Sequence, residues 1–221
     1  MGIRADCRRR FPGSRRGAVP LTCKPERRRL DGVGIDMNEN SKQSLRLFYA
    51  LWPDDLTRGE LVRLQQVLQG RKIPYGNLHI TLAFLGQQPA EQIPALKDIL
   101  MHLPGASMTL TLDRIGYFGR NRIAWAGMHE MPSALAGLQQ QLALALAQHG
   151  VAFDSQFKFK PHITLARDAA PPPDTAFTPI AWKADQVALV QSVMKPEGSS
   201  YQVLASRRID SEVWMPGDAG N

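Results

Sequence analysis

The sequence HITLA occurs twice in the chain, beginning at His79 and again at His162. In each copy a threonine follows the histidine by two residues, as Thr81 in the first copy and Thr164 in the second. Side chains of a strand alternate between its two faces, so the histidine and threonine of each copy project together, away from the aliphatic residues. Each copy is therefore predicted to be a strand that packs aliphatic side chains into a core and presents an imidazole and a hydroxyl on its other face.

Two such strands facing each other would bring four polar groups to one site. Histidine has a reference pKa of about 6.5, so one imidazole can accept a proton while the other donates one near neutral pH. Threonine hydroxyls can donate hydrogen bonds to the non-bridging oxygens of a phosphate. We therefore predict catalytic roles for His79 and His162, and phosphate binding by Thr81 and Thr164.

Other uses of these histidines fit the sequence less well. A lone histidine in a strand is more often structural, but two in equivalent positions of a repeat indicate a function. Zinc sites combine three or four ligands at close spacing, and neither motif has a neighbouring His, Cys or Glu in the H-E-x-x-H arrangement. We therefore expect a site without metal or cofactor. The remaining histidines are interpreted as structural; they are His102, His129 and His149.

Hydrophobic periodicity predicts the elements that hold the two motifs. The order strand, helix, HITLA strand and later strands occurs twice, which indicates a duplicated lobe instead of an array of short repeats. The predicted helices are residues 55–69, 90–102 and 133–150, and the predicted strands are residues 45–53, 77–85, 108–118, 121–128, 160–167, 185–194 and 201–209.

Several of these strands alternate apolar and polar residues, which is typical of antiparallel sheets that are covered on one face. We therefore predict an α+β, two-lobed duplicated fold, in which two mainly antiparallel sheets face a central cleft and the helices lie outside. A cleft between lobes is the natural position of a binding site.

Length and composition fit one globular domain of two lobes. Of the 221 residues, 43% are hydrophobic and 21% are charged, which excludes a mainly disordered chain. No apolar run approaches the roughly 18 residues of a membrane span, so no membrane association is expected. The predicted organisation is a disordered basic leader at residues 1–44, a catalytic domain at residues 45–209 and a tail at residues 210–221.

Most of the net charge of +7 comes from the leader. Residues 1–36 hold ten Arg or Lys against four Asp or Glu, so the rest of the chain has a net charge of only +1. Both cysteines, Cys7 and Cys23, lie there as well, which excludes disulfides from the domain. Three interpretations of the leader remain open: an RNA-binding arm, an organellar transit peptide, or non-native sequence before a true start at Met37.

Paired His-x-Thr-x motifs resemble those of the two-histidine phosphoesterase superfamily. The flanking sequences "LRLFYALWP", "NLHITLAFLG" and "KPHITLARD" are similar to its bacterial RNA 2′,3′-cyclic phosphodiesterase branch, historically called 2′-5′ RNA ligase. The likeness covers about residues 45–209. It implies a two-lobed fold, no metal, and hydrolysis of 2′,3′-cyclic phosphates, at RNA 3′ ends or in small nucleotides, to 2′-phosphates.

The resemblance also implies roles for single residues. His79 and His162 match the catalytic pair, with His162 favoured as base and His79 as acid, although the near-symmetry of the motifs leaves this assignment open. Thr81 and Thr164 match the phosphate-binding hydroxyls, and Arg167 matches a phosphate-contacting arginine. A guanidinium beside a phosphate offers charge-assisted, often bidentate, hydrogen bonds.

Base binding and the reaction type leave alternatives open. Phe48 borders the expected cleft and could stack on a base, but core packing explains it equally well. Ligation through a 2′-5′ linkage is the reverse chemistry, and a module that binds RNA ends without turnover is a third interpretation. We expect a cytoplasmic monomer that hydrolyses cyclic-phosphate ends.

Overall fold

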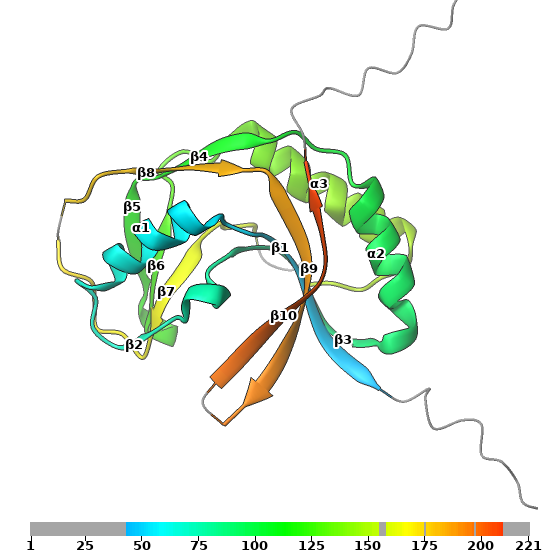
Figure 1. The fold of residues 1–221 in the computed structure, drawn as a ribbon, viewed down its shortest axis with the longest axis horizontal. Helices are drawn as coiled ribbons and strands as arrows, with labels where there is room; N and C mark the ends of the chain where they lie inside the picture. The colour runs from blue at the N-terminus through cyan, green and yellow to red at the C-terminus, as the bar shows by residue number, and fades with distance from the viewer. Residues whose placement is uncertain (1–42, 155–157, 175, 197, 210–221) are drawn as a thin grey trace, which may run out of the picture. The chain divides into compact units, whose positions relative to one another are not determined.

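The computed structural model (Figure 1) describes four stretches of the chain, residues 43–154, 158–174, 176–196 and 198–209. The predicted leader as far as residue 42 and the predicted tail lie outside the described residues. The helices are α1 (Asp55–Gln65), α2 (Ile93–His102) and α3 (Ser133–Gln148), with short 3-10 turns at η2 (Tyr75–Asn77), η3 (Ala90–Gln92) and η4 (Gly119–Asn121). The strands are β1 (Ser44–Leu51), β2 (Arg71–Lys72), β3 (Ile80–Pro89), β4 (Met108–Leu112), β5 (Arg114–Phe118), β6 (Ile123–Gly127), β7 (Ile163–Arg167), β8 (Ile180–Ala184), β9 (Gln186–Lys195) and β10 (Gly198–Arg208).

Most of the described strands form one eight-stranded antiparallel sheet in the order β10-β9-β1-β3-β7-β6-β5, with β2 attached to β7. The other two, β4 and β8, pair as a separate antiparallel sheet. The prediction of an α+β fold with two antiparallel sheets is confirmed. The strands divide between the sheets differently from expectation, however. Strands of both predicted lobes belong to the large sheet, because β3 and β7 pair at Ile80 and Ile163.

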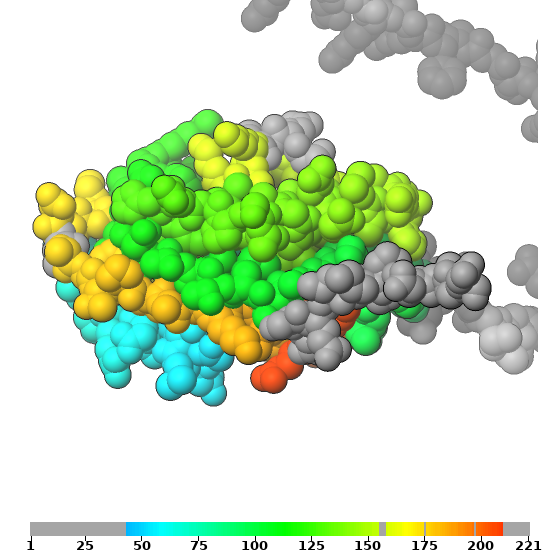
Figure 2. All heavy atoms as spheres, turned by 90° about the horizontal axis from the view of Figure 1, so that it is seen from above, coloured from blue at the N-terminus to red at the C-terminus, as the bar shows by residue number. Residues whose placement is uncertain are grey.

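The helices pack on the two sheets, mainly through leucines at helical spacing. α1 contacts β7 and β8, α2 contacts β9 and β10, and α3 contacts β3 and α2. The outer surfaces of α2 and α3 appear in green in Figure 2. None of the helices in the described part of the chain has the length and apolar character needed to cross a bilayer. The four buried leucines of α3 form one stripe; they are Leu135, Leu138, Leu142 and Leu146.

A second, smaller apolar cluster lies apart from the main core. It contains Phe48, Ala50, Ala188 and Val190, from the adjacent strands β1 and β9. The rings of Trp52, Phe84 and Tyr201 pack against it. We call the sheet face that carries this cluster the histidine face, because two of these rings also contact the imidazole of His79.

The element prediction was wrong in four respects. The predicted strand 108–118 breaks at Asp113, whose carboxylate accepts a hydrogen bond from the His129 amide (2.9 Å), so β4 and β5 enter different sheets. β2 was missed because two residues carry no periodicity, and β8 was missed because it is short and follows a proline-rich stretch. Both motif histidines lie directly before their strands instead of within them.

Both motif strands contain a β-bulge at the leucine of HITLA. In β7, Trp125 of β6 lies opposite Thr164, whereas the preceding residue of β6 lies opposite Ala166, so Leu165 is the extra residue. The β1–β3 pairing has the same shift at Leu82. A bulge re-aims the side chains that follow it. Arg167 therefore returns to the face of Thr164, whereas strict alternation would point it to the core.

The backbone of the β7 bulge is held by a buried glutamine from α1. Gln65 is 3% exposed, and its side-chain Nε2 donates to the carbonyl oxygens of Leu165 (2.8 Å) and Ile73 (2.9 Å). The Ile73 amide also donates to the Leu165 oxygen (2.9 Å). The amide of Gln65 thus joins α1, the segment after β2 and the second motif strand.

Replacing Gln65 by leucine should destabilise the fold, because it leaves buried carbonyl groups without their side-chain donor. We expect the free energy of unfolding to fall by about 1–3 kcal/mol, measured by urea denaturation. The adjacent Gln66 is exposed and provides a matched control, for which Gln66→Leu should change stability by less than about 0.5 kcal/mol. Equal stability of both variants would show that the buried amide contributes nothing.

Candidate active site

The two motifs meet at the centre of the large sheet. Ile80 and Ile163, which directly follow the motif histidines, are paired across β3 and β7 and are fully buried. Continuing this antiparallel register by one residue in each direction places each histidine opposite the threonine of the other motif. Directly opposed residues share a face, with Cβ atoms about 4.5–5.5 Å apart. His79, His162 and both threonines therefore gather on the histidine face, and all four are partly exposed.

Each imidazole is oriented by the carbonyl group two residues before it. The His79 Nδ1 lies 2.7 Å from the Asn77 oxygen, and the His162 Nδ1 lies 2.7 Å from the Lys160 oxygen. A carbonyl only accepts, so Nδ1 carries the proton in both rings. The Nε2 atoms are left to act as base or, when protonated, as acid. The Nε2 of His79 lies 3.1 Å from the Thr81 hydroxyl.

Asn77 has a second contact that stabilises this arrangement. Its side-chain Nδ2 donates to the backbone oxygen of Ser199 in β10 (2.8 Å). The segment whose carbonyl orients His79 is therefore tied to the β9–β10 hairpin. This contact was not predicted, because an asparagine next to a turn carries no specific signal in the sequence.

Aromatic rings surround both imidazoles. The ring of His79 lies 4.9 Å from that of Phe48, 5.3 Å from that of Tyr201 in edge contact, and 5.9 Å from that of Trp52 in a stacked arrangement. These rings come from β1, the residue just after it, and β10. They restrict the water around His79 on several sides.

Fewer aromatic rings lie around His162. Phe118 meets its ring edge-on at 5.1 Å, and Trp125 lies 6.1 Å away. The indole of Trp125 lies across Gly116, where a Cβ atom would come within 2.0 Å of the ring, and beside Gly127, where the distance would be 2.8 Å. Glycine at these positions lets the indole lie close to the sheet beside His162.

A buried arginine lies behind the first imidazole. Arg58 of α1 is 3% exposed, its Nε donates to the Pro53 oxygen (2.9 Å) and its Nη1 to the Tyr75 oxygen (2.6 Å). Its guanidinium lies over the Trp52 ring at 4.8 Å, on which His79 in turn stacks. Sequence analysis missed Arg58, although its position three residues before the buried Leu61 places it on the apolar stripe of the helix.

Burial keeps both imidazoles neutral in the free protein. Burial lowers the pKa of His79 to about 4, although the bond to Asn77 opposes the change, and the positive charges of His162, Arg58 and Arg167 lower this pKa further. Burial also lowers the pKa of His162, and the charge of Arg167 adds to the effect. A bound anion would act in the opposite direction, because it favours the protonated ring.

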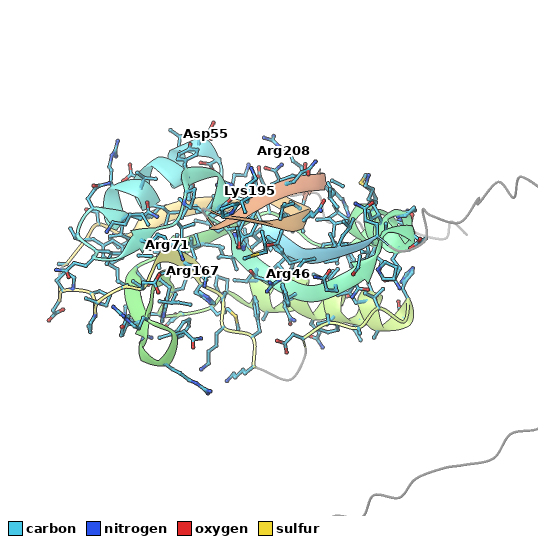
Figure 3. All side chains as sticks on the ribbon, turned by 90° about the horizontal axis from the view of Figure 1, so that it is seen from below. Arg46, Asp55, Arg71, Arg167, Lys195 and Arg208 are labelled. Carbon is cyan, nitrogen blue, oxygen red and sulfur yellow. The ribbon has the colours of Figure 1, made fainter. Side chains whose placement is uncertain are left out.

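Arg167 lies at the exposed end of β7, and its charge acts on both histidines. Figure 3 shows it beside Arg71, the residue that faces it across β2 and β7. The structure therefore brings the five main predicted residues to one region. A base contact by Phe48 is not favoured, because its side chain is only 3% exposed and supports His79 and Tyr201 instead.

Neither the two surface pockets nor the other histidines form an alternative candidate site. Two surface pockets, of about 260 and 590 Å³, lie beside α1 and β5, and no motif residue lines them. The three other histidines are exposed and contact residues of their own surroundings: His102 contacts Asp98, His129 contacts Asp113 and His149 contacts the Ala145 oxygen.

Sequence comparison finds relatives that span most of the domain. A family-wide profile described as the 2′-5′ RNA ligase superfamily matches residues 53–194. The RNA 2′,3′-cyclic phosphodiesterase of Thermus thermophilus is 35% identical over 176 residues, which are 72% of this chain and 88% of the relative. The Escherichia coli protein of the same name is 42% identical over 109 residues, which are 47% of this chain and 61% of the relative.

Solved structures agree with this match. The apo form of Escherichia coli LigT has a TM-score of 0.66 and 29% identity, covering 76% of this chain and 99% of that one. The same protein complexed with 3′-AMP has a TM-score of 0.65 and 32% identity over the same shares. The Thermus thermophilus protein TT0787 has a TM-score of 0.66 and 30% identity, covering 76% of this chain and all of the other.

The neutral state of the two imidazoles can be measured by NMR titration. In the free protein we expect His79 to titrate near pH 4, and His162 to titrate below its usual value of about 6.5. Adding inorganic phosphate should raise both pKa values, so binding near pH 6 should take up protons. A His79 that titrates near 6.5 without phosphate would contradict the effect of burial.

The same shifts set the direction of the pH dependence of stability. The unfolded chain binds protons at these histidines between about pH 6.5 and 4, where folded His79 does not. Burying these histidines in the neutral form therefore costs no stability above about pH 6.5. As the pH falls from about 6.5 to 4, the free energy of unfolding decreases, because the unfolded chain gains protons that the folded chain does not bind.

Proposed function

Because the chain belongs to the 2′-5′ RNA ligase superfamily, we propose that it is an RNA 2′,3′-cyclic phosphodiesterase that hydrolyses 2′,3′-cyclic phosphate ends to 2′-phosphates. The observation that carries the proposal is the matched orientation of His79 and His162. Each donates from Nδ1 to a carbonyl oxygen at 2.7 Å, which leaves two Nε2 atoms for proton transfer. Relatives bear the name of this activity, and LigT has been crystallised with 3′-AMP and with phosphate.

In the proposed reaction, one neutral Nε2 removes a proton from water as the water oxygen attacks phosphorus. The bond from phosphorus to the ribose 3′ oxygen breaks, and the other histidine, protonated at Nε2, gives its proton to that oxygen. The product is a 2′-phosphate with a free 3′ hydroxyl. Proton exchange with solvent then restores the two starting states.

The acid must be protonated when the reaction begins, which places a demand on the bound phosphate. If His79 is the acid, as the resemblance implies, the substrate must raise its pKa from about 4 to near 7. The negative charge of the phosphodiester beside the ring supplies this effect in the proposal. The hydroxyls of Thr81 and Thr164 and the guanidinium of Arg167 are proposed to hold the non-bridging oxygens.

We propose that the reaction at this site is hydrolysis, with RNA ends or small nucleotides as substrates. We expect the protein to be a cytoplasmic monomer. Ligation uses the same groups with a ribose 5′ hydroxyl in place of water. Product analysis separates these reactions, because hydrolysis gives a 2′-phosphate and ligation gives a 2′-5′ linkage. A module that only binds would return the substrate unchanged.

The decisive test uses a dinucleotide ending in a 2′,3′-cyclic phosphate, with a strong chelator present. The wild-type chain should produce the 2′-phosphate, and kcat/KM should depend on pH as a bell. His79→Ala and His162→Ala should each lower kcat/KM about 10²- to 10⁴-fold, the usual contribution of one general acid or base. The double variant should lose less than the product of the two effects.

His149→Ala is a suitable control, because this histidine lies exposed at the end of α3. It should keep wild-type activity. Full activity in either motif variant would refute the paired mechanism, and activity that needs added zinc would show that the histidines are metal ligands.

Arg167→Ala should weaken transition-state binding by about 1.5–3 kcal/mol, the range for a hydrogen bond to a charged group. Arg167→Lys should restore only part of kcat/KM, because lysine lacks the planar fork of donors. Arg63→Ala is the control, since Arg63 is an exposed residue of α1 paired with Glu60. An unchanged kcat/KM in Arg167→Ala would show that Arg167 is a solvated surface residue without a role in the reaction.

A further inference from the structure

A second arginine faces Arg167 across the edge of the site. β2 contains only Arg71 and Lys72, and its pairing with β7 places Arg71 directly opposite Arg167 (Figure 3). Directly opposed residues of an antiparallel pair share a face. Because the bulge at Leu165 returns Arg167 to the histidine face, Arg71 projects from that face too.

Two like charges in directly opposed positions destabilise a strand pair unless an anion lies near them. Among the described residues, Asp168 pairs with Arg71, with its Oδ2 3.6 Å from Nη2 of the arginine. Both side chains of this ion pair are more than half exposed, at 54% and 70%, so the pair contributes little to stability. The local protein charge therefore offsets the two guanidinium groups only in part.

The side chain of Arg71 is held in place, but its hydrogen-bond donors are not all used. A Cβ atom at Gly198, whose φ is +129°, would lie 3.4 Å from its Nη1, so the guanidinium rests against the tip of the β9–β10 hairpin. In the described part of the chain, no acceptor forms a hydrogen bond with this guanidinium. Apart from the long, exposed ion pair with Asp168, the donors of this guanidinium thus have no acceptor among the described residues and can serve a ligand from outside.

Lys72, by contrast, is already engaged. Its ammonium group donates to the Leu68 carbonyl oxygen, and it lies opposite the buried Ala166. Of the two basic residues of β2, only Arg71 is directed to the histidine face.

We propose that Arg71 binds the phosphodiester that precedes the terminal cyclic phosphate, so that the preferred substrate is an RNA oligonucleotide and not a mononucleotide. This inference rests on the proposed function, in which Arg167 holds the cyclic phosphate itself. The neighbouring guanidinium then meets the next phosphate of the strand. A nucleoside 2′,3′-cyclic monophosphate has no such group, so the two substrates distinguish this contact from the catalytic ones.

The test compares kcat/KM for a nucleoside 2′,3′-cyclic monophosphate with kcat/KM for a trinucleotide that ends in the same cyclic phosphate. In Arg71→Gln, the ratio of the trinucleotide value to the mononucleotide value should fall about tenfold, mainly through KM, and Arg71→Lys should recover part of it. The dependence of log(kcat/KM) on log salt for the trinucleotide should become shallower by about 0.7, the slope for one phosphate contact on a single strand. Lys97→Gln, an exposed charge on α2, should keep the wild-type ratio.

A second arm changes the substrate instead of the protein. Replacing the adjacent phosphodiester with an uncharged methylphosphonate should lower the wild-type ratio to that of Arg71→Gln and should have no further effect on the variant. An unchanged ratio in Arg71→Gln, or a methylphosphonate that reacts as well as the natural trinucleotide, would overturn the inference. A wild-type chain that hydrolyses neither substrate would instead overturn the proposed function.

Discussion

The pairing of Ile80 with Ile163 is the contact on which the site depends. It joins the two halves of the large sheet and fixes the register of the two motifs. Because side chains alternate along a strand, a slip by one residue would expose both isoleucines and turn both imidazoles toward the core. Both isoleucines are fully buried, so the apolar core itself opposes such a slip. The hydrophobic effect thus sets the relative position of the two motif histidines, whose imidazoles lie on the opposite face of the sheet from the buried isoleucines.

The bulges at Leu82 and Leu165 explain how two equal motifs build an unequal site. In each strand the bulge buries the alanine that follows and returns the next residue to the histidine face. That residue is Phe84 in β3 and Arg167 in β7. The same bulge thus adds a ring to the apolar cluster beside His79 in one strand and a cation to the histidine face in the other. The near-symmetry of the sequence therefore ends at the residue after the buried alanine, which is aromatic in one strand and cationic in the other.

Sequence patterns were sufficient for the chemistry and for the class of fold, since the two HITLA copies and the strand alternation are local signals. They were not sufficient for the division of strands between sheets, because one backbone pair at Ile80 decides it and leaves no mark on composition. The burial of Arg58 was missed because a charged residue on an apolar helix stripe is normally assumed to reach solvent. The position of Arg167 on the histidine face depends on the bulge at Leu165, which strict alternation does not predict. Its proposed contact with phosphate came from a family resemblance instead.

The burial of the two imidazoles also affects what happens after the reaction. The proposed product is a monoester, which carries more negative charge than the cyclic diester, so a permanently cationic site would hold the product more tightly than the substrate. Rings around His79 and His162 favour the neutral form of each imidazole, and Arg58 and Arg167 oppose its charging. Each histidine that loses its proton to solvent removes one positive charge from beside the product. In the proposed reaction, the aromatic rings that keep the free imidazoles neutral would therefore hold the more highly charged product less tightly than two permanent cations in the same positions.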